Sequence, residues 1–199
     1  MPKVAKNVAK HDIYTRGAQV PSPKTKKGTR LDRSKPFDEN DTVLIKTGET
    51  YYTWSINFGG TYIQKTPPTA SQLTTSEFLK AAYDINDRLA AFSADSPEDV
   101  ESGIDEIKSE IENLRDETQE KFDNMPDGLR EGDTGQLLEE RVEACDECIN
   151  ELDQIDIDFE PYEKDEEGDE DEEEEAANEH ESDWISDKVG EVKDCTINV

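Results

Sequence analysis

The stretch SPEDVESGIDEIKSEIENLRDETQEKF, residues 96–122, decides the fold of this chain. It opens with helix start signals: a Ser at the cap position, a Pro at the first helical position and two acids in the first turn. Its apolar residues then repeat at alternating steps of four and three, which is the seam of a coiled coil. These residues are Val100, Ile104, Ile107, Ile111 and Leu114. The stretch therefore predicts a helix over 97–122 with one narrow apolar stripe.

A second heptad stripe follows after the helix breaker NMPDG at 124–128. It consists of Leu138, Val142, Cys145, Ile149 and Leu152. Two such helices joined by about a dozen residues most simply pair antiparallel. We therefore expect a coiled-coil-like helical hairpin over 95–160, which projects from the rest of the chain and offers a seam for oligomer formation.

Upstream of the hairpin, residues 41–94 change to strand periodicity. Tyr52, Trp54, Ile56 and Phe58 alternate with polar residues, and Gly59-Gly60 supplies a tight turn. A first strand at 42–45 and a returning strand at 61–65 complete a predicted three-stranded antiparallel sheet. A helix near 75–92, opened by a Thr74–Glu77 capping box, is expected to cover its apolar face. The predicted fold class is α+β.

The two flanks carry opposite charges. Residues 1–35 have a formal charge of +8, whereas 95–160 carry −20 and 161–199 carry −14 of the total −29. We expect a disordered basic arm over 1–40 and a disordered acidic tail over 161–199, because neither holds enough apolar residues for a core. The tail ends in a short amphipathic motif, a candidate partner-docking segment. Its apolar residues are Trp184, Ile185, Val189 and Val192.

The composition limits the class of protein. Only 32% of the residues are hydrophobic and 37% are charged, and no run of them is long enough for a membrane span. Three cysteines, an odd number, argue against a disulfide framework and fit a reducing compartment. We expect a cytoplasmic protein without membrane partners.

The basic arm is the stronger of two nucleic-acid signals, since unstructured cations bind phosphate without sequence preference. The alternative for the arm is a solubilising or autoinhibitory tail that pairs with the acidic run. Tyr51 and Tyr62, if they lie on the free face of the sheet, are candidates for stacking on bases. Tyr14, His11 and Arg16 also form a patch that a partner could contact. The candidate nucleic-acid residues are Lys3, Lys6, Lys10, Arg16, Lys24, Lys26, Lys27, Arg30, Arg33, Lys35, Lys46, Tyr51, Tyr62 and Lys65.

No catalytic constellation is evident. Cys145 and Cys148 have CxxC spacing, but acids surround them and Cys145 falls in the heptad seam, where Cys acts as a small hydrophobe. Neither His has a placed Ser or Asp partner. We therefore expect a non-enzyme with no metal and no cofactor.

Several strings resemble a family of uncharacterised phage and prophage proteins, which implies a phage origin and carries no assigned activity. They are GETYYTW (48–54), FGG (58–60), KTPP (65–68), SQLTTSEF (71–78), FDNMP (122–126) and GDTGQLLEER (132–141). More loosely, three strands followed by a helix are similar to the AP2-like arm-binding domain of tyrosine integrases. This sheet departs from a DNA-reading sheet in offering only Lys46 and Lys65 as cations.

Together these observations predict a non-catalytic phage accessory protein associated with nucleic acid or its processing machinery, in the host cytoplasm. In this interpretation the arm contacts phosphate, and the acidic tail competes for the arm or docks a partner. An acidic interaction protein, or a nucleic-acid mimic that binds basic host or phage proteins, is the alternative. A virion or scaffold component is a second one.

Overall fold

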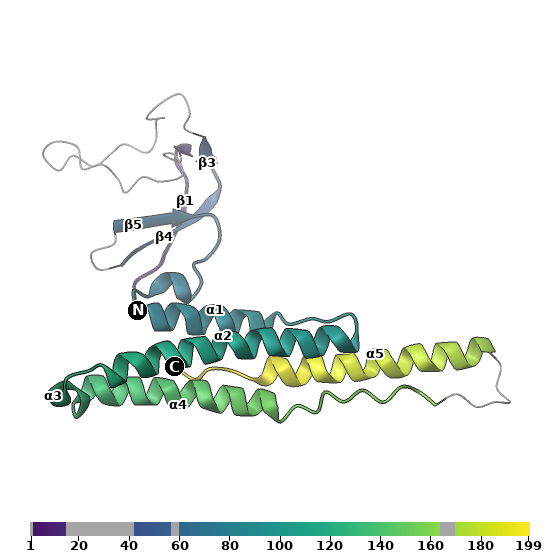
Figure 1. Cartoon of the computed structure of the whole chain (residues 1–199). Helices are drawn as coiled ribbons and strands as arrows, with labels where there is room; N and C mark the ends of the chain where they lie inside the picture. The colour runs from purple at the N-terminus through teal and green to yellow at the C-terminus, as the bar shows by residue number, and fades with distance from the viewer. Residues whose placement is uncertain (1, 15–41, 57–59, 164–169) are drawn as a thin grey trace, which may run out of the picture. The chain divides into compact units, whose positions relative to one another are not determined.

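The computed structural model describes residues 2–14, 42–56, 60–163 and 170–199 (Figure 1). The chain divides into two compact units, a sheet unit at Met1–Ser76 and a helical unit at Glu77–Val199. The sheet unit contains a three-stranded antiparallel sheet and the helical unit contains four long helices. The α+β class expected from the sequence is confirmed.

The sheet unit is built on a bent two-stranded ribbon. Strands β1 (Ala5–Val8) and β4 (Thr50–Ile56) pair antiparallel in one half, and β2 (Ile13–Tyr14) and β3 (Val43–Ile45) pair antiparallel in the other. Strand β5 (Gly60–Gln64) adds to the free edge of β4 and gives the order β1-β4-β5. The β4–β5 hairpin is therefore confirmed, although Phe58 and Gly59 lie outside the described residues.

Two expectations about this unit are wrong. Residues 5–8 and 13–14 are strands, so 1–40 is not an unstructured arm throughout. The third strand of the sheet is β1, whereas the expected first strand at 42–45 pairs with β2 instead. The physical reason is that an open strand edge is completed by backbone hydrogen bonds, which need little apolar content. Because cations lie in and between β1 and β2, the sequence does not indicate that these segments pair as strands.

The helical unit contains the predicted hairpin. Helix α2 (Pro97–Asp123) starts as expected, because the Ser96 hydroxyl accepts a hydrogen bond of 3.2 Å from the Asp99 N–H. After the short α3 (Asp127–Arg130), helix α4 (Asp133–Asp153) packs along α2. The heptad residues of both helices are buried except Val142, which is half-buried. The hairpin prediction is confirmed.

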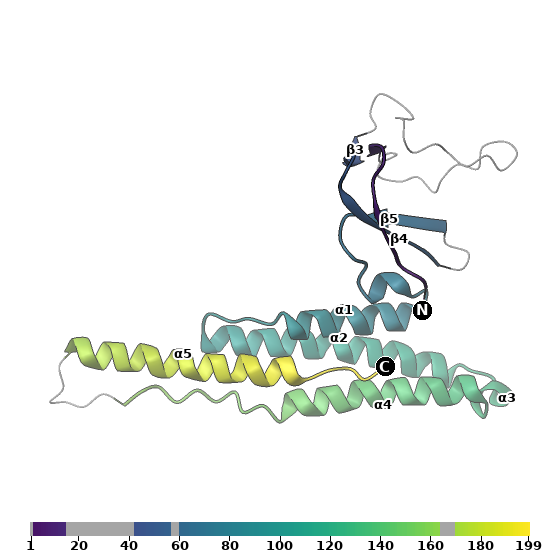
Figure 2. The ribbon, with the colours of Figure 1, turned by 180° about the vertical axis from the view of Figure 1, so that it is seen from behind.

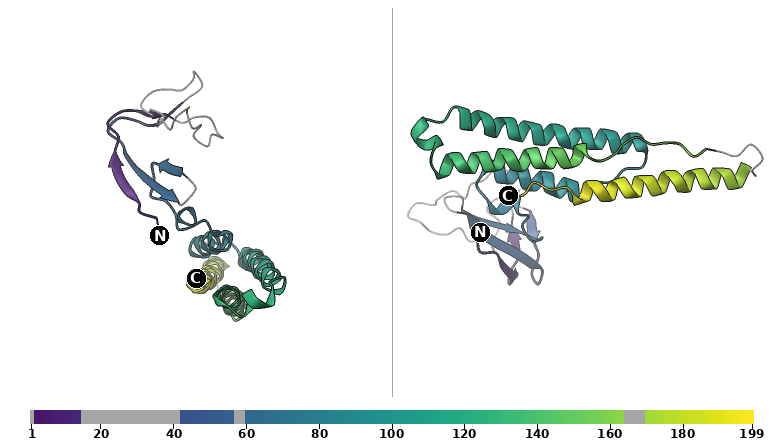
Figure 3. Two further views of the ribbon diagram at one scale, coloured as in Figure 1. Left: turned by 90° about the vertical axis from the view of Figure 1, so that its left-hand side faces the viewer. Right: turned by 90° about the horizontal axis from the view of Figure 1, so that it is seen from below.

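The hairpin does not project alone. Helix α1 (Glu77–Ala90) packs on α2, and α5 (Glu170–Asp194) packs on both α1 and α2. Seen end-on, the four long helices surround one core (Figure 3, left). The buried side of α1, with Phe78, Ala82, Ile85 and Leu89, belongs to this core. The expectation that this helix serves as the cover of the sheet is therefore wrong, because its apolar face completes the helical unit.

Helix α5 corrects the prediction of a disordered acidic tail. The segment after α4 continues in the direction of that helix, and α5 runs back beside it (Figure 2); the Phe159 ring of this segment contacts Trp184 edge-on with centroids 5.2 Å apart. The first turns of α5 are nearly all acidic. Acids there interact favourably with the positive end of the helix dipole, and Glu is a good helix former. Residues 164–169 lie outside the described part.

The supposed docking motif is part of the core. Val192 is fully buried, and Trp184, Ile185 and Val189 are half-buried against the same cluster. These residues therefore help to hold α5 on the bundle.

Residues beyond α5 are also fixed to the bundle. Cys195 and Ile197 are buried, and the Asn86 side chain pairs with the Ile197 backbone as a strand would. Its amide donates to the Ile197 C=O at 3.0 Å, and its carbonyl accepts from the Ile197 N–H at 2.8 Å. The C-terminal segment is thus joined to α1 across 111 positions of sequence.

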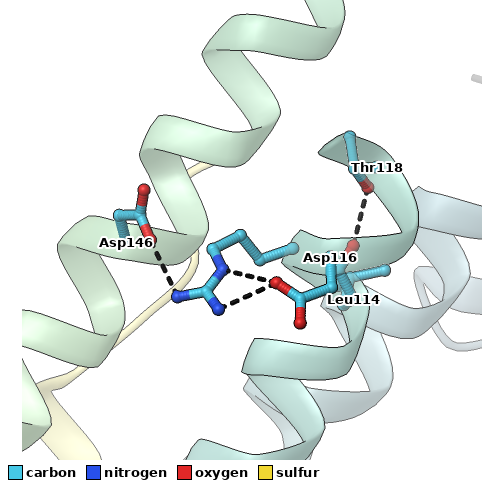
Figure 4. A network of polar contacts seen from close by, with 5 residues as sticks. Leu114, Asp116, Thr118 and Asp146 are labelled. Carbon is cyan, nitrogen blue, oxygen red and sulfur yellow. Dashed lines mark hydrogen bonds and ion pairs between the residues drawn. The ribbon is translucent and has the colours of Figure 1, made fainter. Parts of the chain in front are cut away.

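Polar contacts connect the helices around this core. Arg115 on α2 donates to Asp146 on α4 at 3.3 Å and also pairs with its neighbour Asp116 (Figure 4). The buried Thr118 hydroxyl donates back to the Leu114 C=O at 2.7 Å, so a polar group continues the seam without an unmet hydrogen bond. Lys108 forms a second ion pair across the hairpin, with Asp153.

The turn between α3 and α4 requires a glycine. A Cβ on Gly135 would stand 1.9 Å from the Arg130 carbonyl oxygen. The Arg130 guanidinium in turn donates to the Asp123 C=O at 2.6 Å, at the end of α2. The GDTGQ string at 132–136 therefore packs the turn tightly against the preceding helix end.

Candidate nucleic-acid interface

The bend of the ribbon shapes the candidate interface in the sheet unit. The Asp12 carboxylate accepts from the Thr47 N–H at 2.7 Å and from its hydroxyl at 2.8 Å, and so ties the β1–β2 bend to the β3–β4 bend. Gly48 adopts φ +88° in the second bend, a conformation that favours glycine. Two backbone bonds, from Ala9 N–H to the Glu49 C=O and from Gly48 N–H to the Ala9 C=O, close the joint.

A concave pocket of about 480 Å³ lies along the β1–β2 side of this bend. Its lining includes Asn7, Lys10, His11, Asp12 and Tyr51, and the Asn7 side-chain nitrogen already donates within the sheet, to the Ala5 C=O at 3.1 Å and the Thr53 hydroxyl at 3.2 Å. The lining residues therefore include a cation and aromatic rings, which are residue types with which proteins hold an unpaired base and its phosphate. The pocket is as large as the smaller sites that take up drug-sized ligands.

The cations of the sheet unit are available to a ligand. Lys3, Lys6, Lys10 and Lys46 are exposed, and none of them forms an ion pair with another described residue. Lys65 differs, since it pairs with Glu49 at 2.9 Å. Lys6 lies opposite Tyr52 in the β1–β4 register, and Lys46 lies at the bend beside Asp12 and Glu49.

Both described acids of this unit are held by neighbours. Hydrogen bonds from the Thr47 backbone and hydroxyl lower the pKa of Asp12. The pKa of Glu49 is lowered first by its hydrogen bond with Lys65 and then by the Lys46 N–H. The two carboxylates therefore stay ionised and stabilise the bend, while the four lysines form no ion pair with another described residue.

The two candidate tyrosines lie on opposite faces of the sheet, which corrects the expectation that both occupy the free face. Tyr62 pairs with Trp54 in the β4–β5 register, and their rings stack with centroids 5.4 Å and planes 13° apart. Trp54 is buried and donates its indole N–H to the C=O of Gln72, which lies in the short helix η1 (Ser71–Leu73). Tyr62 remains 44% exposed, so its outer face is open to a stacking partner. Tyr51 pairs with Asn7 on the other face, at the pocket.

Most of the predicted basic arm lies outside the described residues. This applies to Arg16, Lys24, Lys26, Lys27, Arg30, Arg33 and Lys35. The two ends of that segment are nonetheless placed, because Tyr14 and Val43 are register partners. The seven cations therefore belong to a connection between paired strands β2 and β3, and not to a free terminus.

The cysteines form no reactive or metal site in the described part of the chain. Cys145, Cys148 and Cys195 are free thiols, all buried. Burial raises the pKa of Cys148 to about 12 and that of Cys145 and Cys195 to about 11. Within the described ranges, no three His, Cys, Asp or Glu side chains are grouped to hold a metal ion. None of the helices described has the length and apolarity needed to span a membrane.

Two residues of this site, Asn7 and Asp12, are not predicted from the sequence. In the sequence Asp12 is only one of two acids within a basic stretch, and Asn7 carries no signal until β1 is placed beside β4. A search of protein-family models, curated proteins and solved structures finds no match to this chain.

Proposed function

We propose that the sheet unit binds nucleic acid, and that the chain is a non-catalytic accessory protein of a phage in the cytoplasm of its host. The observation that carries the proposal is a set of exposed lysines before and along β1 and at the bend, Lys3, Lys6, Lys10 and Lys46, which form no ion pair with another described residue, whereas the two described acids of the unit are already engaged. Cations without partners are the groups that release counterions when they meet phosphate.

The charge of the two units supports the same division of roles. Residues 1–76 carry 12 Lys or Arg against six acids, whereas 77–199 carry ten against 45. A polyanion is therefore attracted to the sheet unit and repelled by the helical unit, which restricts binding to one part of the chain. The seven cations in the segment that connects β2 to β3 add to the positive charge of this unit.

The aromatic groups favour an unpaired strand over a duplex. Tyr62 presents an open ring face and Tyr51 lines the pocket, and such rings stack on bases that are free of a partner. The resemblance to phage proteins and the three free thiols support the phage and cytoplasmic parts of the proposal.

The test is an anisotropy titration of the full chain with labelled single-stranded and duplex oligonucleotides between about 50 and 200 mM salt. The triple variant Lys6→Gln/Lys10→Gln/Lys46→Gln should reduce the salt slope by up to about 0.7–0.9 for each phosphate that the protein no longer neutralises. The matched control Lys80→Gln/Lys121→Gln/Lys193→Gln removes the same charge from exposed positions of the helical unit. Equal slopes for the two triple variants, or no binding of either oligonucleotide at the lowest salt, would contradict the proposal.

A second candidate is an acidic interaction protein that imitates nucleic acid. It is favoured by the ion pairs of the helical unit, which engage Arg88, Lys108, Arg115, Lys121 and Lys188 and still leave most of the carboxylates exposed. A purified basic DNA-binding protein bound to the helical unit should then be displaced by free duplex DNA. Binding that DNA does not displace would argue against mimicry.

A further inference from the structure

A cleft of about 290 Å³ opens between α1 and α2 in the helical unit. Its floor is apolar and consists of Ala81 and Ile85 from α1 and Leu114 from α2. The volume is at the lower limit of sites for drug-sized ligands, which span roughly 300–1,000 Å³. The cleft therefore suits a few apolar side chains of a larger partner better than a separate small molecule.

The rim of the cleft is acidic, and its two ends differ in how closely cations pair with the carboxylates. Arg88 is the one cation in the lining, and it is held at one end by Glu110 and by Glu106 at 3.7 Å. Because α1 and α2 are joined by a short loop and run antiparallel, residues that precede Arg88 lie opposite residues that follow Glu110. The other end of the cleft is thus bordered by Asp84 and Glu117.

The carboxylates at that end are poorly paired within the described residues. Asp84 is exposed and forms no ion pair there, and Glu117 reaches its only described cation, Lys121, at 4.0 Å. An apolar floor with carboxylates beside it is complementary to a helix that carries apolar residues on one side and Lys or Arg at its margins.

We infer that the α1–α2 cleft is a docking site for a basic amphipathic helix of another protein, which inserts apolar side chains over Ile85 and Leu114 and places cations at Asp84 and Glu117. A helix from a second copy of this chain fits less well, because each of the long helices described here is itself acidic. This surface is separate from the candidate nucleic-acid interface, and it names a partner chemistry that the proposed function does not.

The probe is a labelled peptide of about 18 residues, long enough to form a helix, with Leu at i, i+3, i+4 and i+7 spacing and Lys elsewhere. A peptide of the same composition with scrambled Leu positions tests whether the apolar floor contributes. The full chain should bind the amphipathic peptide more tightly than the scrambled one, and amide signals of residues 81–88 and 110–117 should shift on binding.

Asp84→Lys/Glu117→Lys should weaken binding by about tenfold or more, because each reversal replaces an attraction with a repulsion. Asp87→Lys/Glu120→Lys is the matched control, since both residues are exposed on the same helices and do not line the cleft. Equal weakening by the two variants, equal binding of the two peptides, or shifts confined to other helices would each overturn the inference. Nucleic-acid binding should be the same in both variants, so this inference and the proposed function fail separately.

Discussion

Replacing Asn86 with Ala should loosen the C-terminal segment from the helical unit. The Asn86 side chain makes two hydrogen bonds with the Ile197 backbone, at 2.8 and 3.0 Å, in a half-buried position. Each such bond contributes a net of about 0.5–1.5 kcal/mol. Ala has a higher helix propensity than Asn, which offsets roughly 0.6 kcal/mol of the lost hydrogen-bond free energy. The free energy of unfolding should therefore fall by about 1–2 kcal/mol.

The assay is urea unfolding followed by far-ultraviolet circular dichroism, which reports mainly on the helices. With a slope of about 1–3 kcal/mol/M, the expected loss moves the midpoint down by roughly 0.3–2 M. Asn150→Ala is the control, because Asn150 is exposed on α4 and has the same propensity change without a described partner. It should be neutral or slightly stabilising.

The attribution to Ile197 can be tested in a chain that ends at Cys195. There the Asn86→Ala change should have the same effect as Asn150→Ala, because the bonding partner is gone. If Asn86→Ala alone leaves the midpoint where Asn150→Ala leaves it, or still destabilises the shortened chain by its full amount, the reasoning is refuted.

Further changes test the core, the turn and the charges. Ile107→Ala should cost about 2–5 kcal/mol in urea unfolding, since the side chain is 2% exposed, and no loss would contradict the paired seam. Gly135→Ala should destabilise by about 1–3 kcal/mol through its clash with the Arg130 carbonyl, whereas Gly190→Ala, which meets nothing within 4 Å, should stabilise slightly. Screening with about 0.5 M salt should raise the melting temperature of the full chain, because 45 acids face ten cations in the helical unit; a lowered temperature would count against repulsion. Burial raises the pKa of Cys148 to about 12, so the folded state keeps a proton that the unfolded state releases near the ordinary thiol pKa. Stability should therefore fall above about pH 9, by up to about 1.4 kcal/mol per pH unit for this thiol, and Cys148→Ala should make the measured decline shallower.

Local patterns predicted those parts of the fold that depend on neighbouring residues. The heptad spacing of Val100 to Leu114 fixes which side of α2 is buried, and Ser96 marks its start, so both could be read without the structure. The β4–β5 hairpin follows likewise from alternation around Trp54 and from the turn residues after it.

Long-range pairing could not be read in this way. Strand β1 is recognisable only because Ala5 to Val8 meet Thr50 to Thr53, and no local pattern records that partner. Helix α5 begins with a run of acids, and that run does not indicate a helix in the sequence. The burial of α5 depends on Val192, which packs into a core built from α1, α2 and α4. For the candidate interface, the lysines could be listed from the sequence, but the bend made by Asp12 and Thr47 required the structure.

The contact between Asn86 and Ile197 also sets an order of events during synthesis. Helices α1, α2 and α4 emerge from the ribosome before α5 and the segment that closes their core. Until those last residues arrive, the apolar stripe of the growing chain has no complete cover, and a pairing that spans 111 positions forms late. Copies of this incompletely folded intermediate repel one another, because α2 and α4 carry many carboxylates. This repulsion opposes aggregation until the core is complete.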